Sequence, residues 1–253
     1  MNPERNVPLA PHTSLRVGGP ADYLLVAHSE AEMVDGLRWA RDQGVPVRVI
    51  GGGSNLLVAD AGVDGLVIKA VTSHFEVDGE VVTARAGVTI ASMARKLAKR
   101  GLSGLEWAAN VPGTVGGAVV NNAGAFGGET AACVIEATIV NAEGQLRTLD
   151  QAELGYAYRT SVLKRGELGE VAVVQARWRA RHSTPEEADG NVRHFNAQRM
   201  RSQPRILSAG SVFANPEGLF AGKLIDEAGL KGATIGGARI SEQHANFIVN
   251  PGG

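Results

Sequence analysis

The sequence predicts an α+β protein, on three observations. Residues 29–43, 90–100 and 183–201 carry the apolar spacing and the end signals of helices. Short apolar, β-branched runs between them indicate strands. Two glycine-rich segments, 51–55 and 110–118, interrupt this pattern. Because helices and strands do not alternate regularly, separate α+β domains are expected in place of one doubly wound sheet.

The first predicted unit spans residues 1–70. Its helix at 29–43 opens with a capping box formed by Ser29 and Glu32, and Gly44 ends it. Apolar runs predict three strands in this unit, at residues 45–50, 56–58 and 66–68.

The second predicted unit spans residues 71–182, and the third spans 183–253. In the second unit Thr89 is expected to cap a helix that Gly101 ends. Proline at position 185 marks the first turn of the long helix that opens the third unit. Strands of the second unit are expected at residues 81–86, 134–140 and 171–178. Apolar and charged residues alternate at 178–181, which indicates that one face of the strand is exposed to solvent there.

Composition excludes several classes of protein. A net charge of −1 gives no basic footprint for nucleic acid. The single cysteine, Cys133, lies in an apolar run, which predicts a buried, inert thiol in a reducing compartment. The N-terminus lacks the apolar core of a secretory signal, and no run reaches the ~18 apolar residues of a membrane helix. A soluble cytoplasmic protein is expected.

The two glycine-rich segments are the strongest functional signal. Glycine lacks a Cβ, so such segments can expose backbone N–H groups that cradle phosphates. Residues 51–55 (GGGSN) match neither the dinucleotide fingerprint nor the P-loop, and a tight surface turn is the alternative. Residues 110–118 (NVPGTVGGA) open a long stretch poor in charge, to which Asn121 and Asn122 add amides, and such loops are rarely mere connections. One large phosphorylated ligand held at two places is therefore predicted.

Six short motifs occur in order along almost the whole chain: residues 15–21 (LRVGGPA), 51–55 (GGGSN), 112–117 (PGTVGG), 158–159 (YR), 209–213 (AGSVF) and 229–232 (GLKG). This ordered set resembles the UDP-N-acetylenolpyruvoylglucosamine reductases, which make UDP-N-acetylmuramate for peptidoglycan. The region before the AGS motif has no long insertion and resembles the shorter type of that family.

The resemblance implies a two-part FAD-binding module of the vanillyl-alcohol-oxidase (PCMH) kind, followed by a small α/β substrate-binding domain. It implies noncovalent FAD, because no histidine lies in or beside the GGGSN segment. The residues expected at the cofactor are Gly51, Gly52, Gly53, Ser54, Asn55, Pro112, Gly113, Thr114, Gly116, Gly117 and Ala118.

The resemblance also implies a reaction in two halves. NADPH reduces FAD, and the flavin then delivers hydride to the enol ether of UDP-N-acetylglucosamine enolpyruvate. Arg159 matches the family arginine that holds the developing negative charge, and Ser211 matches its proton donor. Lys223 fits either a diphosphate or a plain surface position. The full set expected at the sugar nucleotide is Tyr158, Gln203, Asn215, Lys223, His244 and Asn246.

One departure from the family stands out. The family carries a third catalytic residue, a glutamate beyond the stretch that here reads HANFIVN, and no residue up to Gly253 takes that role. A missing C-terminal segment is the expected reason, and the alternatives are an acid supplied from elsewhere and an impaired form of the enzyme. No metal site is expected, because His244 has no ligand partner at metal spacing. The alternatives are another flavin oxidase of the same superfamily and a module that binds FAD or UDP-sugar without full activity. The oligomeric state and the preference for NADPH over NADH stay open.

Overall fold

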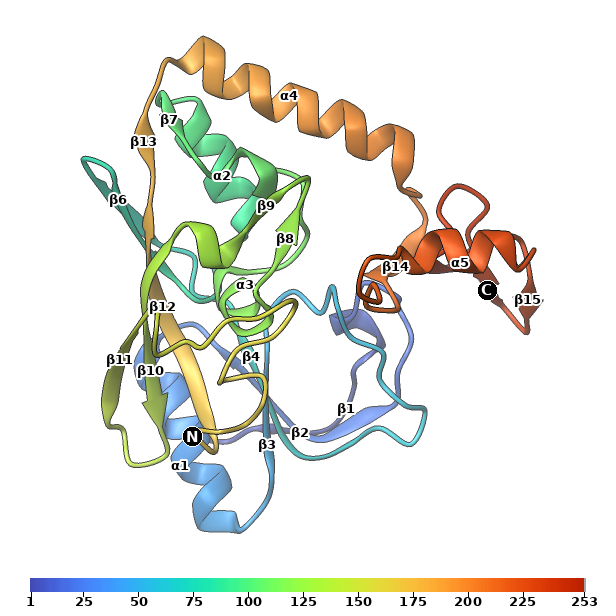
Figure 1. Cartoon of the computed structure of the whole chain (residues 1–253). Coiled ribbons are helices and arrows are strands. Elements are labelled where there is room, and N and C mark those ends of the chain that lie inside the picture. Colours follow the sequence, from blue (N-terminus) through green and yellow to red (C-terminus); the bar gives the residue numbers. More distant parts are fainter. Residues whose placement is uncertain (253) are drawn as a thin grey trace. The chain divides into compact units, whose positions relative to one another are not determined.

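The computed structural model describes residues 1–252, which form two compact units. Unit 1 contains Met1–Val7, Ala21–Gly52 and Val63–Asn196. Unit 2 combines Pro8–Pro20 and Gly53–Gly62 with the chain from Ala197 onward. Figure 1 labels elements of both units where there is room. The three-part division at residues 70 and 182 stays a prediction.

The first sheet has the strand order β1-β2-β4-β3, and both β2 and β3 run parallel to β4. Helix α1 connects β2 to β3. Parallel strands need a long crossover connection, which is usually a helix. The bounds are β1 Glu4–Pro8, β2 Pro20–Ala27, α1 Glu30–Gln43, β3 Val47–Ile50 and β4 Val63–Ala70.

The helix predicted at 29–43 is confirmed as α1. The Ser29 hydroxyl accepts a hydrogen bond from the Glu32 N–H at 3.1 Å. The Glu32 carboxylate reaches one residue further back than a capping box requires and accepts from the His28 N–H at 2.7 Å. Gly44 ends the helix with a left-handed φ of 65°.

The strand predicted at residues 56–58 is wrong. These residues form an irregular segment of unit 2, and Leu57 is 77% exposed. The Ala59 carbonyl accepts from the N–H groups of Gly19 and Gly62, both at 2.9 Å, so local turns replace a sheet ladder here. Apolar composition alone does not distinguish such a segment from a strand.

The second sheet of unit 1 is antiparallel and has the order β11-β10-β12-β6-β5. The predicted alternation near its end is confirmed: Trp178 is fully buried, whereas Arg179 is exposed. The bounds are β5 Phe75–Asp78, β6 Val81–Arg85, β10 Val134–Asn141, β11 Leu146–Asp150 and β12 Val171–Arg179.

Two helices cover this second sheet. Helix α2, Ile90–Ala98, is confirmed, but the Thr89 side chain makes no capping hydrogen bond, contrary to expectation. Helix α3, Val115–Asn121, was not predicted, because its first turn is rich in glycine. The short elements around them are β7 Leu102–Ser103, η2 Glu106–Ala108, β8 Gly124–Ala125, β9 Gly128–Glu129, η3 Thr130–Ala132 and β13 Arg181–His182.

Helix α1 joins the two sheets through a shared hydrophobic core. Met33 and Leu37 are almost fully buried and pack in one cluster with Ile68 of β4 and Val140 of β10. Burying an apolar side chain of this size contributes about 1.5–3 kcal/mol. The two sheets of unit 1 therefore form one packed body.

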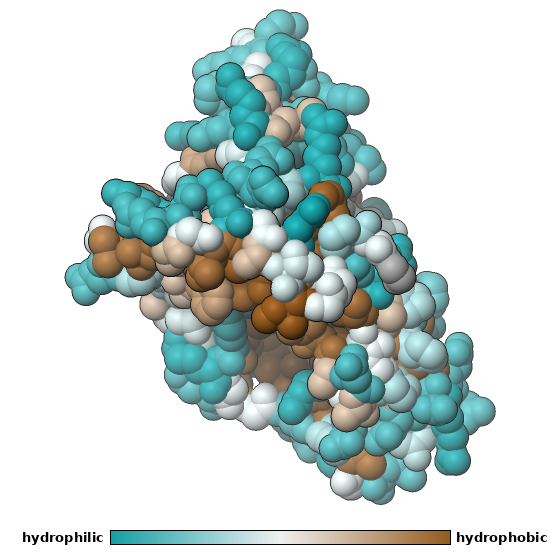
Figure 2. Space-filling view, turned by 90° about the vertical axis from the view of Figure 1, so that its right-hand side faces the viewer, coloured by the Kyte–Doolittle hydropathy of each residue, from teal (hydrophilic) through white to brown (hydrophobic). Residues whose placement is uncertain are grey.

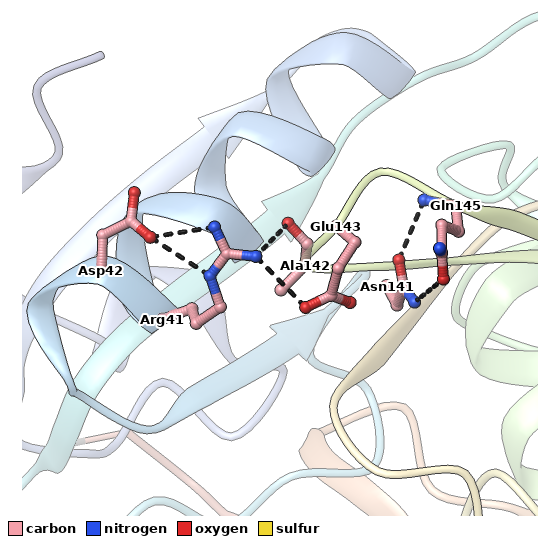
Figure 3. A network of polar contacts seen from close by, with 6 residues as sticks. All are labelled: Arg41, Asp42, Asn141, Ala142, Glu143 and Gln145. Carbon is pink, nitrogen blue, oxygen red and sulfur yellow. Dashed lines mark hydrogen bonds and ion pairs between the residues drawn. The ribbon is translucent and has the colours of Figure 1, made fainter.

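Polar contacts add to this junction at the surface (Figure 3). The Arg41 guanidinium of α1 donates to the Glu143 carboxylate at 3.1 Å and to the Ala142 carbonyl at 3.5 Å. In the same turn the side chains of Asn141 and Gln145 share a hydrogen bond of 3.0 Å. The turn between β10 and β11 is thus held against the end of α1.

The long helix predicted at 183–201 is confirmed as α4, Pro185–Ser202. The Thr184 hydroxyl accepts from the Glu187 N–H at 3.2 Å and caps it. Within unit 1, Phe195 of this helix stacks on Phe126, with ring centroids 5.6 Å apart. No helix within residues 1–252 combines the length and hydrophobicity needed to cross a membrane.

Unit 2 has its own antiparallel sheet, of order β14-β17-β16-β15. Its bounds are β14 Leu207–Ser211, α5 Ala221–Glu227, β15 Thr234–Ile235, β16 Ala238–Ile240 and β17 Phe247–Asn250, and η1 Ala10–His12 lies in the same unit. Figure 2 shows apolar patches on the molecular surface. Large exposed apolar residues of unit 2 include Val212, Phe213, Leu219, Phe220, Leu224, Leu230 and Ile235.

The buried thiol gives a first prediction. Burial raises the pKa of Cys133 to about 12, so at pH 8 the native protein holds about 1000-fold less thiolate than an exposed cysteine. We expect no measurable reaction of the native protein with a thiol-specific disulfide reagent, and one thiol per chain after unfolding in guanidinium. Free glutathione is the control. Rapid native labelling would contradict the burial of this side chain.

Candidate functional site

The two glycine-rich segments meet in unit 1. The first begins directly after β3, and a Cβ added to Gly51 would lie 2.2 Å from Oγ1 of Thr114. A Cβ on Gly52 would lie 3.4 Å from Cα of Gly113. A side chain at position 51 would collide with the Thr114 side chain, so glycine there lets Thr114 pack against the main chain of the first segment. The segments that the sequence singled out are therefore neighbours in space.

Helix α3 begins within the second segment. Thr114 is its N-cap and accepts from the Gly117 N–H at 3.4 Å. The N–H of Gly116 donates to the Ala86 carbonyl at 2.8 Å, and the N–H of Ala118 donates to the Thr114 carbonyl at 2.9 Å. These two N–H groups are already paired inside the protein, so Gly116 and Ala118 support the segment. Their contact with a cofactor stays a prediction.

The first residue of this segment carries a buried donor without a partner. Among residues 1–252, the Nδ2 atom of Asn110 is buried and makes no hydrogen bond. An unpaired buried amide costs about 1–3 kcal/mol, which a ligand acceptor would recover. A dinucleotide carries many acceptor oxygens and nitrogens. The close glycine packing and this orphaned donor both fit a cofactor such as FAD.

The remainder of the first segment belongs to unit 2. Gly53 has a φ of 63°, and a Cβ there would lie 2.0 Å from the His12 carbonyl oxygen. Its own carbonyl accepts from the Ser14 N–H at 3.1 Å. Only glycine allows this approach. Ser54 and Asn55 follow in a turn, where Asn55 is exposed.

Arg159 lies in a tight turn of unit 1. Ala157 and Thr160 pair across the turn through hydrogen bonds of 3.1 and 3.3 Å, and Arg159 has a left-handed φ of 57°. Its guanidinium donates to the carbonyl of Asn122 at 3.1 Å and to that of Gly124 at 2.6 Å. No carboxylate within residues 1–252 pairs with it. The charge is oriented but not neutralised, as the binding of an anion requires.

Tyr158 accompanies Arg159 in the same turn. It is 52% exposed, and the Arg159 guanidinium lies 5.2 Å from the centroid of its ring. A cation at this distance is attracted to the face of the ring. The motif thus places one exposed aromatic ring and one cation side by side.

Ser211 ends strand β14 of unit 2, opposite Phe247 of β17, and is exposed. The chain just beyond it is fixed by Asn246, which is 4% exposed. The Asn246 amide accepts from the Phe213 N–H at 2.9 Å and donates to the Phe213 carbonyl at 2.8 Å. The Asn246 side chain therefore holds the backbone two residues beyond Ser211. Its contact with substrate stays a prediction.

The other predicted substrate residues also lie in unit 2. Oδ1 of Asn215 accepts from the Ala221 N–H at 3.1 Å, at the start of α5. Lys223 lies 3.6 Å from Glu227 and is 71% exposed. Burial lowers the pKa of His244, whose ring lies 4.7 Å from that of Phe247. Within residues 1–252, Oε1 of Gln203 is buried without a hydrogen bond.

Asn122 and Ser161 contact this arginine turn. The sequence grouped the Asn122 amide with the ligand loop, but that amide is buried and bonds to Ala157, Glu129 and Ala131 inside the protein. Ser161 was assigned no role. The signal for Asn122 was the second asparagine of a pair that follows an apolar stretch, because asparagine is common at left-handed helix ends. For Ser161, its place two residues after Arg159 was the only signal. Among residues 1–252, no three His, Cys, Asp or Glu side chains gather as metal ligands.

Known proteins match both parts of the chain. A family model described as an FAD binding domain matches residues 21–150. A second, the C-terminal domain of UDP-N-acetylenolpyruvoylglucosamine reductase, matches residues 202–253. UDP-N-acetylenolpyruvoylglucosamine reductase 2 of Symbiobacterium thermophilum is 44% identical over 98% of this chain and 80% of the relative.

Solved structures agree with these matches. The UDP-N-acetylenolpyruvylglucosamine reductase of Thermus caldophilus superposes with a TM-score of 0.87 at 38% identity, over 100% of this chain and 90% of that one. A solvent-stable cholesterol oxidase superposes with a TM-score of 0.50 at 23% identity, over 70% of this chain and 37% of the oxidase. The oxidase shares the fold alone.

Proposed function

This chain belongs to the UDP-N-acetylenolpyruvoylglucosamine reductase family, and on that premise we propose how its own residues carry out the reaction. It is an FAD-dependent oxidoreductase that reduces the enolpyruvyl ether of its UDP-sugar substrate to UDP-N-acetylmuramate, a peptidoglycan precursor. The observation that carries the residue assignments is the packing of Gly51 against Thr114, which joins the two segments predicted to hold the cofactor. We place the reaction in the cytoplasm, with NADPH as the reductant.

The two glycine-rich segments would hold FAD noncovalently. The cofactor held there would supply the redox chemistry, which carries hydride from NADPH to the enolpyruvyl group. Small residues let the cofactor approach the main chain, and the orphaned Asn110 amide can donate to it. Gly116 and Ala118, whose N–H groups bond to backbone carbonyls, act as supports. The residues assigned to this task are Gly51, Gly52, Gly53, Ser54, Asn55, Pro112, Gly113, Thr114, Gly116, Gly117 and Ala118.

Arg159 holds the charge that the reaction develops. Hydride addition to one carbon of the enol ether leaves negative charge on its neighbour, which shares it with the substrate carboxylate. A guanidinium stays protonated and grips a carboxylate through two parallel hydrogen bonds. Since Arg159 has no acidic partner within residues 1–252, its charge is available for this group.

Ser211 supplies the proton that completes the reduction. A hydroxyl is a weak acid, but a carbanion beside a carboxylate is a strong base, so transfer from serine to carbon is feasible. The exposed end of β14 leaves the hydroxyl open to a ligand. The sugar nucleotide would be bound by Tyr158, Gln203, Asn215, Lys223, His244 and Asn246.

Anaerobic visible spectroscopy tests this function. The purified protein is expected to carry a yellow, dissociable flavin that NADPH bleaches. UDP-N-acetylglucosamine enolpyruvate is then expected to restore the absorbance with stoichiometric formation of UDP-N-acetylmuramate. Bleaching that the sugar nucleotide never reverses would mean that the chain binds flavin without completing the reaction.

Gly51→Ala should weaken FAD binding at least about tenfold, because the new methyl group meets Thr114 at 2.2 Å and separates the two segments. The dissociation constant can be measured by flavin fluorescence on apoprotein. Gly237→Ala is the matched control, since a Cβ there has no atom within 4 Å and the backbone needs no positive φ. Equal FAD affinity in both variants would remove position 51 from the cofactor site.

A further inference from the structure

The side chain of Asn122 makes three hydrogen bonds at the base of the Arg159 turn. It is 1% exposed and is the C-cap of α3. Its Nδ2 donates to the Ala157 carbonyl at 3.1 Å and to the Glu129 carboxylate at 3.3 Å, and its Oδ1 accepts from the Ala131 N–H at 2.9 Å. One buried amide therefore ties the turn to both α3 and β9.

A hydrogen bond from Ser161 holds the other side of the turn. Ser161 is fully buried, and its hydroxyl donates to the Val120 carbonyl of α3 at 2.7 Å. The Arg159 guanidinium itself donates to the backbone carbonyl of Asn122 at 3.1 Å. The turn is thus fixed before, at and after Arg159 to the last turn of one helix.

The backbone conformation explains why the turn needs these hydrogen bonds. Asn122, Phe126 and Arg159 all have left-handed φ values, of 44°, 54° and 57°. This conformation is unfavourable for residues other than glycine, by about 1–3 kcal/mol, and persists only where the surroundings determine it. Asparagine tolerates it best of the three. Arg159 depends on its neighbours to keep this geometry.

Helix α3 connects the arginine turn to the glycine-rich segments. Its N-cap is Thr114, which faces Gly51, and its C-cap is Asn122. A helix of seven residues is about 10 Å long and stiff. The direction of the Arg159 guanidinium is therefore set relative to the segments proposed to hold the cofactor.

We propose that Asn122 is a positioning residue for the second half-reaction: its side chain fixes the left-handed turn that aims Arg159 at the substrate carboxylate. This inference rests on the proposed role of Arg159. Asn122 acts through the Ala157 carbonyl and the turn, and it needs no contact with substrate or cofactor.

The test is Asn122→Gly, which keeps the left-handed backbone and removes the side chain. We expect flavin content and flavin bleaching by NADPH to stay at the level of the parent protein. Reoxidation by UDP-N-acetylglucosamine enolpyruvate should slow about 10- to 100-fold, as loss of orientation typically costs. Asn141→Gly is the matched control, since its side chain bonds only to Gln145 among the described residues (Figure 3). Equal slowing of both half-reactions would overturn the proposal.

A double-variant cycle separates positioning from general damage. If Asn122 acts through Arg159, Asn122→Gly should have no further effect on reoxidation in an Arg159→Ala background. If the two substitutions together slow reoxidation by the product of their separate factors, the proposal is overturned. If Arg159→Ala alone leaves the rate of reoxidation unchanged, the proposed function itself is overturned. Should Asn122→Gly not fold, Asn122→Asp in a Glu129→Gln background keeps the shape and the Oδ1 acceptor, loses the donor to Ala157 and avoids two facing carboxylates. The same pattern is expected. Full reoxidation activity in this protein, when folded, would contradict the inference.

Discussion

Replacing Ser211 by alanine is expected to slow the second half-reaction about 100- to 10,000-fold, the usual contribution of a positioned acid or base. NADPH should bleach the flavin of this variant at the parent rate, because hydride transfer to the cofactor requires no proton from the protein's β14. Rapid-mixing absorbance at the flavin band measures both rates separately. The bleached protein should persist for minutes in the presence of the sugar nucleotide.

Ser208→Ala provides the matched control for this experiment. Ser208 lies on the same strand, opposite Val249, and its exposure is intermediate. Its loss should leave both half-reactions unchanged. Ser211→Cys adds a second measurement, because a thiol is a stronger acid than a hydroxyl and should restore part of the rate. If Ser211→Ala slows flavin reduction as much as reoxidation, Ser211 is not the proton donor.

The fold was predictable where local signals determine it. Ser29 and Gly44 lie at the expected ends of α1, and Pro185 lies at the expected start of α4, because helix ends depend on residues within one turn. Helix α3 escaped prediction because glycines at 116 and 117 disfavour helix locally, while burial of Val115 and Val119 in the core of unit 1 stabilises it. Tertiary packing overrides propensity in such a short helix.

The site was predictable only in part. The glycine-rich segments stood out by composition, whereas Arg159 and Ser211 gained a role only through the motifs around them. The sequence grouped Asn122 with the ligand loop, and its bonds to the arginine turn could not be predicted, because its partners Glu129, Ala131 and Ala157 lie up to 35 residues away in sequence. Residues that hold other residues in place carry no local chemical signature.

Replacing Arg159 by alanine should reduce the rate of reoxidation about 100- to 1000-fold, the typical cost of removing a preorganised group from a developing anion. Arg159→Lys should recover little, because a lysine ammonium cannot form the paired, planar hydrogen bonds of a guanidinium. It also cannot donate to the carbonyls of Asn122 and Gly124 in the same geometry.

Two measurements distinguish a role of Arg159 in charge stabilisation from a role in binding alone. If the guanidinium stabilises the transition state, Arg159→Ala lowers kcat and kcat/KM together, and NADPH still bleaches the flavin at the parent rate. A rise in KM with unchanged kcat would assign Arg159 to ground-state binding only. Arg165→Ala is the control, since Arg165 lies nearby in sequence and pairs with Glu167 at the surface. Added guanidinium ion should partly restore the rate of Arg159→Ala and not that of Ser211→Ala, because only the first variant lacks a cation.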